Sequence, residues 1–484
     1  MSILVIDLGT SSVRASVVND DSTVTAERSR PTLPDSPVAG LVEFDALRYV
    51  TAAIECAREV LSAHGPVDSV GVANQRATTI VWDRRTGEPV APAQGWQDLR
   101  TVGDCLVLAA EGLPLAPNQS ATKIANILDS VDPDRDRDLC FGTPDSWLIW
   151  HLTGGAEHVT DLSNAGIWGL LDAAGTGTAP AVLERLAIPA SMLPRIVDST
   201  GEVAAATILE GAPVICGIAG DQQASLIGQG CVRPGDVKAT FGTGGMLDVC
   251  LGPDRPAFER RGEAGCFPMV AWRDRTGTTW GTEAVMLSAG TNVEWLVEDM
   301  GLIDSPADSE RLANEVTSTE GVTYVPALLG LGTPNWDYGA RAALLGATRG
   351  TSAAHVVRAV LEGVAQRGAD LLESARTDSG LDLRRLRIDG GMSTNSLFAQ
   401  MLSDATGVPV EISPFKEATT LGAGYLAGLA TGVWSGWDDI AAAWSPAAVI
   451  EPTPGIDREA TRQRWAQAVE RAGHWHEDLS ALDF

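Results

Sequence analysis

Short apolar strands alternate with turns of small residues and amphipathic helices in both halves of this 484-residue chain. Residues 3–7 form a buried-type strand, a turn rich in Gly, Thr and Ser follows, and residues 13–18 resume strand character. Apolar residues at helical spacing begin after Asp45 and end before Gly65, and residues 67–73 form the next strand. This order of hairpin, helix and strand predicts an α/β fold.

The same alternation returns in the second half. A helix that starts at residues 351–352 and is closed by Gly380 precedes a strand at residues 386–389. In each half an Asp ends a short strand before small residues, in VIDLGTSS at residues 5–12 and in RIDGGMSTN at residues 387–395. These two segments hint at a duplicated architecture.

Length and composition narrow the class of protein. The chain exceeds the size at which one hydrophobic core keeps growing, so we expect two domains with a cleft between them, residues 1–228 and 229–484. A net charge of −28 argues against binding to the phosphate backbone of nucleic acids. The seven cysteines contain no CxxC pair, and no leader or membrane-spanning run is apparent. We expect a cytoplasmic protein that binds neither nucleic acid nor membrane.

Residues 215–245 place one carboxylate, Asp221, between glycine-rich turns. Gly220 lets a ligand approach the backbone closely, and the FGTGG turn at residues 241–245 offers N–H groups and a hydroxyl to phosphate oxygens. Asp221 follows an apolar strand and begins a helix. It is therefore either an N-cap, worth roughly 0.5–2 kcal/mol, or a general base that takes a proton from a hydroxyl attacking a phosphoryl group. The local sequence favours neither role.

Two further glycine-rich turns also follow strands. Asp7 precedes a turn at residues 9–12 that carries three hydroxyls; it suits either a phosphate with Mg²⁺ held on the carboxylate through water, or a plain polar hairpin. Gly390 and Gly391 form either a tight strand-to-helix turn or a flat seat for an adenine ring. The chain has no GxxxxGK[ST] loop and no GxGxxG fingerprint after its first strand, which disfavours a nicotinamide dehydrogenase.

Together and in this order, these segments resemble the FGGY family of carbohydrate kinases, which share the two-domain, ribonuclease H-like ATPase fold of actin, hexokinase and Hsp70. The similarity covers nearly the whole chain and is strongest to glycerol kinases. It is carried by blocks such as GVANQRATTIVWDRRTGEPV, GIAGDQQASLIGQG and EATTLGAGYLAGLATGVW. The C-terminal signature of the family matches across residues 342–362, whereas its first signature is partial, keeping Lys123 but placing Asn126 where a tryptophan is usual.

The resemblance implies a role for individual residues. Asp221 would be the general base and Gln222 would hydrogen-bond the polyol. Asp7 would serve Mg²⁺, Arg76 would bind substrate hydroxyls, and Trp96 would pack along the carbon chain. The residues implied for the ATP phosphates and adenosine are Thr10, Ser11, Gly242, Thr243, Gly290, Gly391 and Asn395.

Three departures from the glycerol kinase pattern fall on the substrate side. Ala77, Asn118 and Met246 stand where glycerol kinases carry Glu, Tyr and Phe. Losing a carboxylate and two rings should enlarge the pocket and remove an acceptor, and an unpaired buried polar group costs about 1–3 kcal/mol. Asp98 is either a replacement acceptor or a surface carboxylate.

The resemblance therefore implies an enzyme that uses ATP and Mg²⁺ to phosphorylate a hydroxyl of a small polyol or ketose. Glycerol is one candidate, and a four- or five-carbon substrate such as erythritol, ribitol or xylulose is the alternative. A nucleotide-binding sensor that has lost catalysis is a further hypothesis. Similar kinases form homodimers or homotetramers.

Overall fold

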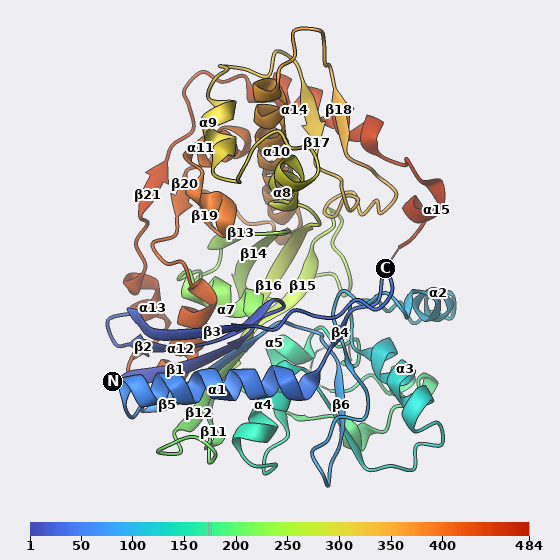
Figure 1. Ribbon diagram of the computed structural model, residues 1–484, viewed down its shortest axis with the longest axis vertical. Coiled ribbons are helices and arrows are strands. Elements are labelled where there is room, and N and C mark those ends of the chain that lie inside the picture. Colours follow the sequence, from blue (N-terminus) through green and yellow to red (C-terminus); the bar gives the residue numbers. More distant parts are fainter. Residues whose placement is uncertain (173–174, 176, 484) are drawn as a thin grey trace.

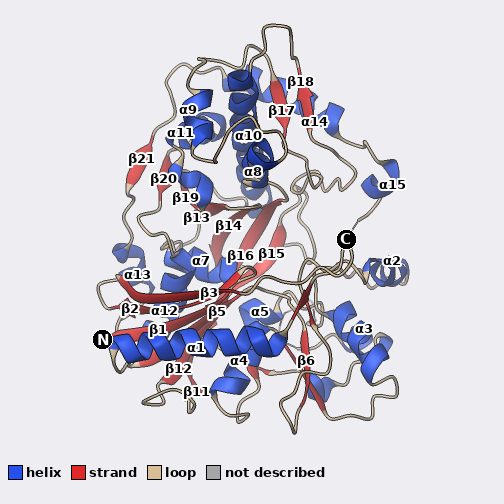
Figure 2. Cartoon of the chain, viewed as in Figure 1, coloured by secondary structure: helices blue, strands red, loops and turns tan. Residues whose placement is uncertain are grey.

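Two β-sheets, each covered by helices, build the molecule (Figures 1 and 2). The computed structural model describes residues 1–172, 175 and 177–483. The first sheet has the order β11-β12-β5-β1-β2-β3. Its strands are β1 (Ser2–Leu8), β2 (Ser12–Asn19), β3 (Val24–Pro31), β5 (Ser69–Asn74), β11 (Thr200–Ala205) and β12 (Val214–Gly220).

The second sheet has the order β15-β16-β14-β13-β19-β20-β21 and lies above the first in Figure 1. Its strands are β13 (Val237–Phe241), β14 (Gly245–Gly252), β15 (Phe267–Asp274), β16 (Gly277–Met286), β19 (Leu386–Asp389), β20 (Val410–Ile412) and β21 (Ala448–Ile450). The sheets confirm the predicted two-domain α/β fold.

The two sheets repeat one topology. In the first, β1, β2 and β3 are antiparallel while β1, β5 and β12 are parallel. In the second, β13, β14 and β16 are antiparallel while β13, β19 and β20 are parallel. The hint of a duplication is confirmed, but the two segments that suggested it are not counterparts. By topology β1 corresponds to β13 and β5 to β19, and the segments look alike because in each a strand of the parallel part of its sheet ends in a turn of small residues.

Helices form where capping residues and apolar periodicity predict them. Asp45 caps α1 (Ala46–His64) by accepting a hydrogen bond from the backbone N–H of Arg48. Ser352 caps α10 (Ala353–Ser379), which ends at Gly380 with φ +67°. The other helices are α2 (Val102–Ala110), α3 (Ala121–Val131), α4 (Pro144–Leu152), α5 (Leu162–Ala165), α6 (Pro180–Arg185), α7 (Asp221–Gly228), α8 (Thr291–Glu298), α9 (Asp308–Ala313), α11 (Ser396–Thr406), α12 (Ala418–Thr431), α13 (Trp437–Ala443), α14 (Arg458–Ala472) and α15 (Glu477–Ser480).

Short strands and 3₁₀ turns complete the chain. The strands outside the two large sheets are β4 (Glu43–Phe44), β6 (Ile80–Asp83), β7 (Ala93–Gln94), β8 (Leu139–Gly142), β9 (Val159–Asp161), β10 (Arg195–Val197), β17 (Thr323–Val325) and β18 (Ala343–Leu345). The 3₁₀ turns are η1 (Ala190–Met192) and η2 (Gly391–Thr394).

Helices α7 and α12 pack against each other between the two sheets, and α12 also packs on β1, β5 and β12 although it lies late in the chain. Glycines allow this close approach. An added Cβ on Gly228 would collide with the carbonyl oxygen of Ala418, and one on Gly422 would collide with that of Ala224. The block EATTLGAGYLAGLATGVW is therefore rich in small residues because it crosses a neighbouring helix at close range.

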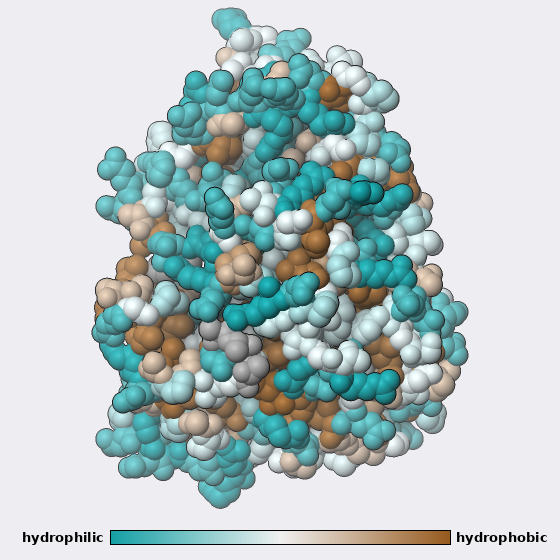
Figure 3. Space-filling model, turned by 180° about the vertical axis from the view of Figure 1, so that it is seen from behind, coloured by the Kyte–Doolittle hydropathy of each residue, from teal (hydrophilic) through white to brown (hydrophobic). Residues whose placement is uncertain are grey.

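The face seen in Figure 3 is largely hydrophilic, with apolar residues in small separate patches. All seven cysteines are buried and free. Within the described ranges, no helix is both long enough and apolar enough to cross a membrane.

Candidate functional site

Three charged residues meet at the carboxyl-end edge of the first sheet. Asp7 lies at the end of β1, Arg76 follows β5, and Asp221 follows β12. The three strands are parallel neighbours, with Asp7 in register with Ala73 of the middle strand. Two strand spacings of about 4.8 Å separate the outer strands, so about 10 Å lies between the ends of β1 and β12. The sheet brings the predicted metal ligand and the predicted base to one edge.

Asp221 is the first residue of α7, and the N-cap position belongs to Gly220. The structure therefore does not give Asp221 the N-cap role. Its Oδ1 accepts a hydrogen bond from the N–H of Gln222 at 2.8 Å. Gly220 also has a packing role that the sequence did not reveal, because an added Cβ there would lie 2.7 Å from the side chain of Arg76. The glycine makes room for that side chain.

Arg76 connects Asp221 to the second sheet. Its Nε lies 3.4 Å from Oδ1 of Asp221, and its Nη2 donates to Oε2 of Glu283 on β16 at 2.7 Å. The side chain of Asp221 is 32% exposed, whereas those of Arg76 and Glu283 are 12% and 11% exposed. Burial raises the pKa of Asp221 from its ordinary value, and the positive charge of Arg76 opposes that shift. The result is a carboxylate that can reach a ligand and is a stronger base than a surface aspartate.

Glu283 was not found from the sequence. It is the one acidic residue of β16, a strand that is otherwise apolar or small, and that isolation is the signal that could have identified it. Glu283 belongs to the site because it accepts a hydrogen bond from Arg76, which lies 207 positions earlier in the chain.

Asp7 has the electrostatics of a cation ligand. Burial raises the pKa of its carboxyl to about 7, Arg14 opposes that shift, and the negative charge of Asp221 adds to it. No group of three or more His, Cys, Asp or Glu side chains that could hold a metal occurs in the described part of the chain. A cation at Asp7 would therefore need oxygens from water and from a phosphate, which is the mixture that Mg²⁺ prefers.

Trp96 and Thr10 lie in contact, although the sequence assigned them to different parts of the site. The indole Nε1 of Trp96 donates to Oγ1 of Thr10 at 3.2 Å, and that hydroxyl donates to Oε1 of Gln75 at 3.1 Å. Ser11 is exposed on the same turn. The hydroxyl of Thr10 is thus engaged with protein groups, while that of Ser11 faces solvent.

The glycine-rich turns of the second sheet come together. The N–H of Gly290 donates to the carbonyl of Gly242 at 2.8 Å, and the N–H of Ala289 donates to that of Thr243 at 2.9 Å. Gly390 has φ +86°, and an added Cβ there would lie 2.5 Å from the carbonyl oxygen of Phe241. The turn after β13, the start of α8 and the turn after β19 therefore form one cluster of backbone, in which Thr243 is exposed and Gly242, Gly290 and Gly390 are half-buried.

Asn395 and Gly391 border this cluster. Asn395 is the N-cap of α11: its Oδ1 accepts from the N–H of Phe398 at 2.9 Å, and its Nδ2 donates to Oγ of Ser309 at 3.3 Å. Gly391 is exposed, with nothing within 4 Å of an added Cβ. The side-chain amide of Asn395 is occupied by the helix cap, whereas Gly391 leaves open space.

The predicted substrate-side residues lie in different surroundings. Ala77 is buried with φ +60°, a left-handed conformation in which few non-glycine residues occur. Met246 is half-buried on β14, in register with Thr240 and Val285. Asn118 is exposed in a loop.

The loop that carries Asn118 is fixed by a buried lysine. The ammonium of Lys123 donates to the carbonyls of Pro117 at 2.5 Å and Gln119 at 3.2 Å, and burial lowers its pKa to about 8. Lys123 was noted from the sequence only as part of a signature, and its function in the structure is to hold this loop.

Asp98 fits neither of its two interpretations. It is fully buried, so it is not a surface carboxylate. Its Oδ2 accepts from the N–H of Val42 at 2.7 Å, and both oxygens accept from the guanidinium of Arg100 at 2.8 Å. These bonds occupy the carboxylate, so it does not replace the missing acceptor.

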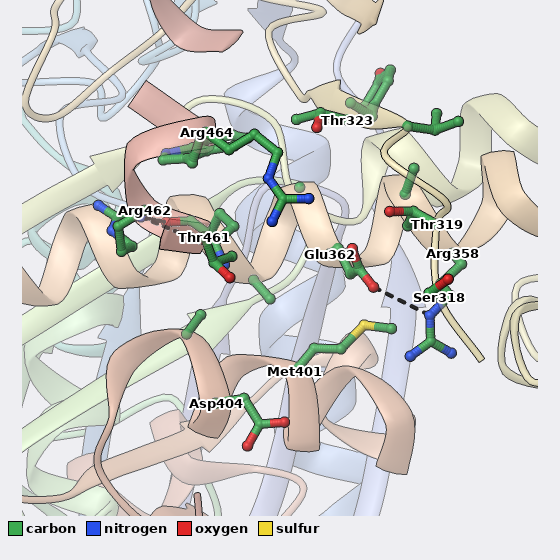
Figure 4. A pocket seen from close by; sticks show the side chains of 18 of the residues that line it. Ser318, Thr319, Thr323, Arg358, Glu362, Met401, Asp404, Thr461, Arg462 and Arg464 are labelled. Carbon is green, nitrogen blue, oxygen red and sulfur yellow. Dashed lines mark hydrogen bonds and ion pairs between the residues drawn. The ribbon is translucent and has the colours of Figure 1, made fainter. Parts of the chain in front are cut away.

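A cavity of about 320 Å³ lies in the second half between α10, the end of α11 and α14 (Figure 4). None of the predicted site residues lines it. Arg358 pairs with Glu362 on α10, as the dashed line in Figure 4 marks, and Arg462 donates to Gln366 and Asp370. Arg462 thus links α14 to α10, whereas Arg358 bonds within α10 and to the carbonyls of Ala313 and Val316.

Comparison with known proteins identifies the family. The description "FGGY family of carbohydrate kinases, N-terminal domain" matches residues 2–228, and "FGGY family of carbohydrate kinases, C-terminal domain" matches residues 238–431. The chain belongs to the FGGY family of carbohydrate kinases. Among curated relatives, this FGGY kinase is 41% identical to a glycerol kinase of Aromatoleum aromaticum over 98% of the chain and 99% of the relative. A glycerol kinase of Trichlorobacter lovleyi is also 41% identical, over 98% of the chain and 99% of the relative.

Solved structures show the same fold. The FGGY kinase superposes on the crystal structure of Plasmodium falciparum glycerol kinase with ADP at a TM-score of 0.90, with 28% identity over 97% of this chain and 98% of the other. A ligand-bound xylulose kinase from Lactobacillus acidophilus gives a TM-score of 0.87, at 19% identity over 99% of this chain and 98% of the other. The latter comparison supports the fold alone.

Proposed function

We propose that this FGGY kinase transfers the γ-phosphoryl group of ATP to a hydroxyl of glycerol or of a similar small polyol, with Asp221 as the general base. The observation that carries the proposal is the position of Asp221. Its carboxylate is partly exposed, has a raised pKa and lies beside Arg76 at the edge where the two sheets meet. Full-length identity of 41% to glycerol kinases supports the reaction type.

The chemistry follows from the placement of these groups. A substrate hydroxyl near Oδ2 of Asp221 would give its proton to the carboxylate as the hydroxyl oxygen attacks phosphorus, and ADP would leave with the electrons of the broken P–O bond. Arg76 would bind neighbouring hydroxyls and hold Asp221 in place. Trp96 would pack along the carbon chain. No covalent phosphoenzyme is needed.

The nucleotide would lie on the turns of the second sheet. Gly242 and Thr243 would offer N–H groups to the phosphates, with Thr10 and Ser11 facing them from the first sheet. The adenosine would lie against Gly290, Gly391 and Asn395, a placement that the exposed surface at Gly391 supports. Among solved relatives, the Plasmodium falciparum enzyme was crystallised with ADP.

Asp7 would hold Mg²⁺ through water. Its carboxylate is held near a second carboxylate and has a raised pKa, an arrangement that a cation relieves. Bound there, Mg²⁺ would neutralise charge on the phosphates. Asp7 itself would orient that hydration shell.

A four- or five-carbon polyol or ketose, such as erythritol, ribitol or xylulose, is the second candidate substrate. Ala77 is buried and small, so no acidic side chain from that position reaches the site. Neither Asn118 nor Met246 has an aromatic ring, so neither gives the pocket an aromatic wall. These three positions favour a substrate larger than glycerol.

Three further assignments are part of the proposal. The chain would divide into residues 1–228, which carry the base and the substrate contacts, and residues 229–484, which carry the nucleotide contacts. The enzyme would act in the cytoplasm. It would assemble as a homodimer or homotetramer.

Release of ADP, measured across a panel of polyols and ketoses with Mg²⁺ and ATP, tests the function. We expect turnover with glycerol or with one of the larger substrates. ATP binding without any ADP release across the panel would instead favour a non-catalytic sensor, and absence of ATP binding would overturn both.

A further inference from the structure

One lysine of the second sheet contacts the predicted substrate-binding amide. Lys238 on β13 is fully buried, and its ammonium has three partners: Oδ2 of Asp248 at 2.7 Å, Oε1 of Gln222 at 2.8 Å and Oγ1 of Thr240 at 3.2 Å. Gln222 and Thr240 accept hydrogen bonds from the ammonium, and Asp248 forms an ion pair with it.

Lys238 stays charged in this position. Burial alone would lower its pKa, but the carboxylates of Asp248, Asp389 and Glu283 outweigh burial and raise it. Asp248 and Glu283 stand in one row with Lys238 across β13, β14 and β16. The second sheet therefore keeps one cation in an acidic row that faces α7.

A charged ammonium donates hydrogen bonds and accepts none. The atom of Gln222 that meets Lys238 must therefore be its carbonyl oxygen, which leaves the amide Nε2 on the other side. Gln222 is half-buried, next to Asp221 in the first turn of α7. Among the residues that the structure describes, no protein acceptor contacts Nε2, so this donor is available to a ligand.

We propose that Lys238 is a positioning residue that fixes Gln222 as an obligate hydrogen-bond donor to the substrate. The inference rests on the proposed function and deepens it. The substrate must then present an acceptor oxygen, a hydroxyl lone pair or a ketose carbonyl, beside the hydroxyl that Asp221 deprotonates. Gln222 lies in the N-terminal family region, which ends at residue 228, and Lys238 is the first residue of the C-terminal region. The side-chain amide of Gln222 is therefore oriented only when the two halves are in contact.

The competing explanation is that Lys238 only neutralises Asp248. The variant Asp248→Asn distinguishes this explanation from the positioning role, because it removes the buried carboxylate but keeps Lys238 and its bond to Gln222. Lys238→Met in that background removes the contact with Gln222 without leaving a buried carboxylate at position 248 unpaired. We expect Asp248→Asn to keep the KM for the polyol within about twofold, and Asp248→Asn/Lys238→Met to raise it about tenfold, the loss of one hydrogen bond.

A double-mutant cycle between Lys238→Met and Gln222→Ala, in the Asp248→Asn background, is the decisive measurement. We expect Lys238→Met to raise the polyol KM about tenfold when Gln222 is present and less than about twofold once it is Ala, with the KM for ATP unchanged throughout. Equal effects of Lys238→Met in both backgrounds would overturn the positioning role while wild-type turnover left the proposed function standing. No turnover by the wild type on any polyol or sugar would overturn both.

Gln222→Glu tests the direction of the hydrogen bond. A glutamate of the same length would accept from Lys238 and would have no proton to donate at neutral pH. We expect its polyol KM to rise at least about tenfold. An unchanged or lower KM would show that the substrate donates to position 222, and would overturn the proposal.

Discussion

Arg76 places its Nε 3.4 Å from Oδ1 of Asp221. The guanidinium also donates to Glu283 from the other sheet, so one side chain contacts both the proposed base and the second sheet. The charge around Asp221 is therefore balanced: burial and Glu283 raise its pKa, while Arg76 and Lys238 lower it. Small changes in these neighbours should move the pH at which the base works.

The pH dependence of kcat/KM tests that balance. Asp221 must be ionised to accept a proton, so activity falls as the pH is lowered through its raised pKa. Glu283→Gln removes a negative neighbour and should shift this acid limb to lower pH, whereas Arg76→Met removes a positive one and should shift it to higher pH. Profiles at saturating Mg²⁺, which keeps Asp7 ionised, would check this. If the acid limb moved in the same direction in both variants, the assignment of that limb to Asp221 would be contradicted.

Asp7→Ala should weaken the response to Mg²⁺. Because the carboxylate is expected to act through water, the concentration for half-maximal rate should rise about 10–100-fold. Asp20→Ala is a matched control, since Asp20 is an exposed carboxylate that pairs with the N-terminus. A magnesium titration that is unchanged in the Asp7 variant would remove Asp7 from the metal site.

Ala77→Glu should favour glycerol over larger substrates. A carboxylate here would restore an acceptor for a short polyol and fill part of the pocket, so the ratio of kcat/KM for glycerol to that for ribitol should rise roughly tenfold. Ala77→Gln has the same length without the charge and serves as the control. If the ratio does not change, position 77 does not set specificity.

Gly422→Ala should destabilise the fold. Its new methyl group would collide with the carbonyl of Ala224 where α12 crosses α7, an overpacking that costs about 1–3 kcal/mol. Gly103→Ala is the control, because Gly103 lies within α2 with nothing within 4 Å of an added Cβ. Urea denaturation should show a lower free energy of unfolding for Gly422→Ala and no decrease for Gly103→Ala. Equal free energies of unfolding for the two variants would contradict the packing argument.

Local signals predicted the elements well. Asp45, Gly65, Ser352 and Gly380 mark helix ends because caps act within a few residues. The strands that lead to Asp7 and Asp221 were predicted from short apolar runs, which are also local signals. The family resemblance then implied a role for each of those two residues.

Contacts between distant segments were not predicted. Glu283 reaches Arg76 across 207 positions, and Lys238 reaches Gln222 through the packing of α7 on β14. The contact of Gly220 with the side chain of Arg76 was also missed, because nothing in its neighbours in sequence reveals it. Such features depend on how the sheets meet, which local patterns do not encode.

The turnover of Asp221→Asn tests the central claim most directly. Asparagine keeps the size and the hydrogen bonds of the side chain but cannot take the proton, so kcat should fall by roughly 10²–10⁴ while ATP binding stays nearly intact. The measurement is ADP release with the best polyol of the panel, beside ATP affinity by calorimetry. A variant that turns over at close to the wild-type rate would show that Asp221 is not the base.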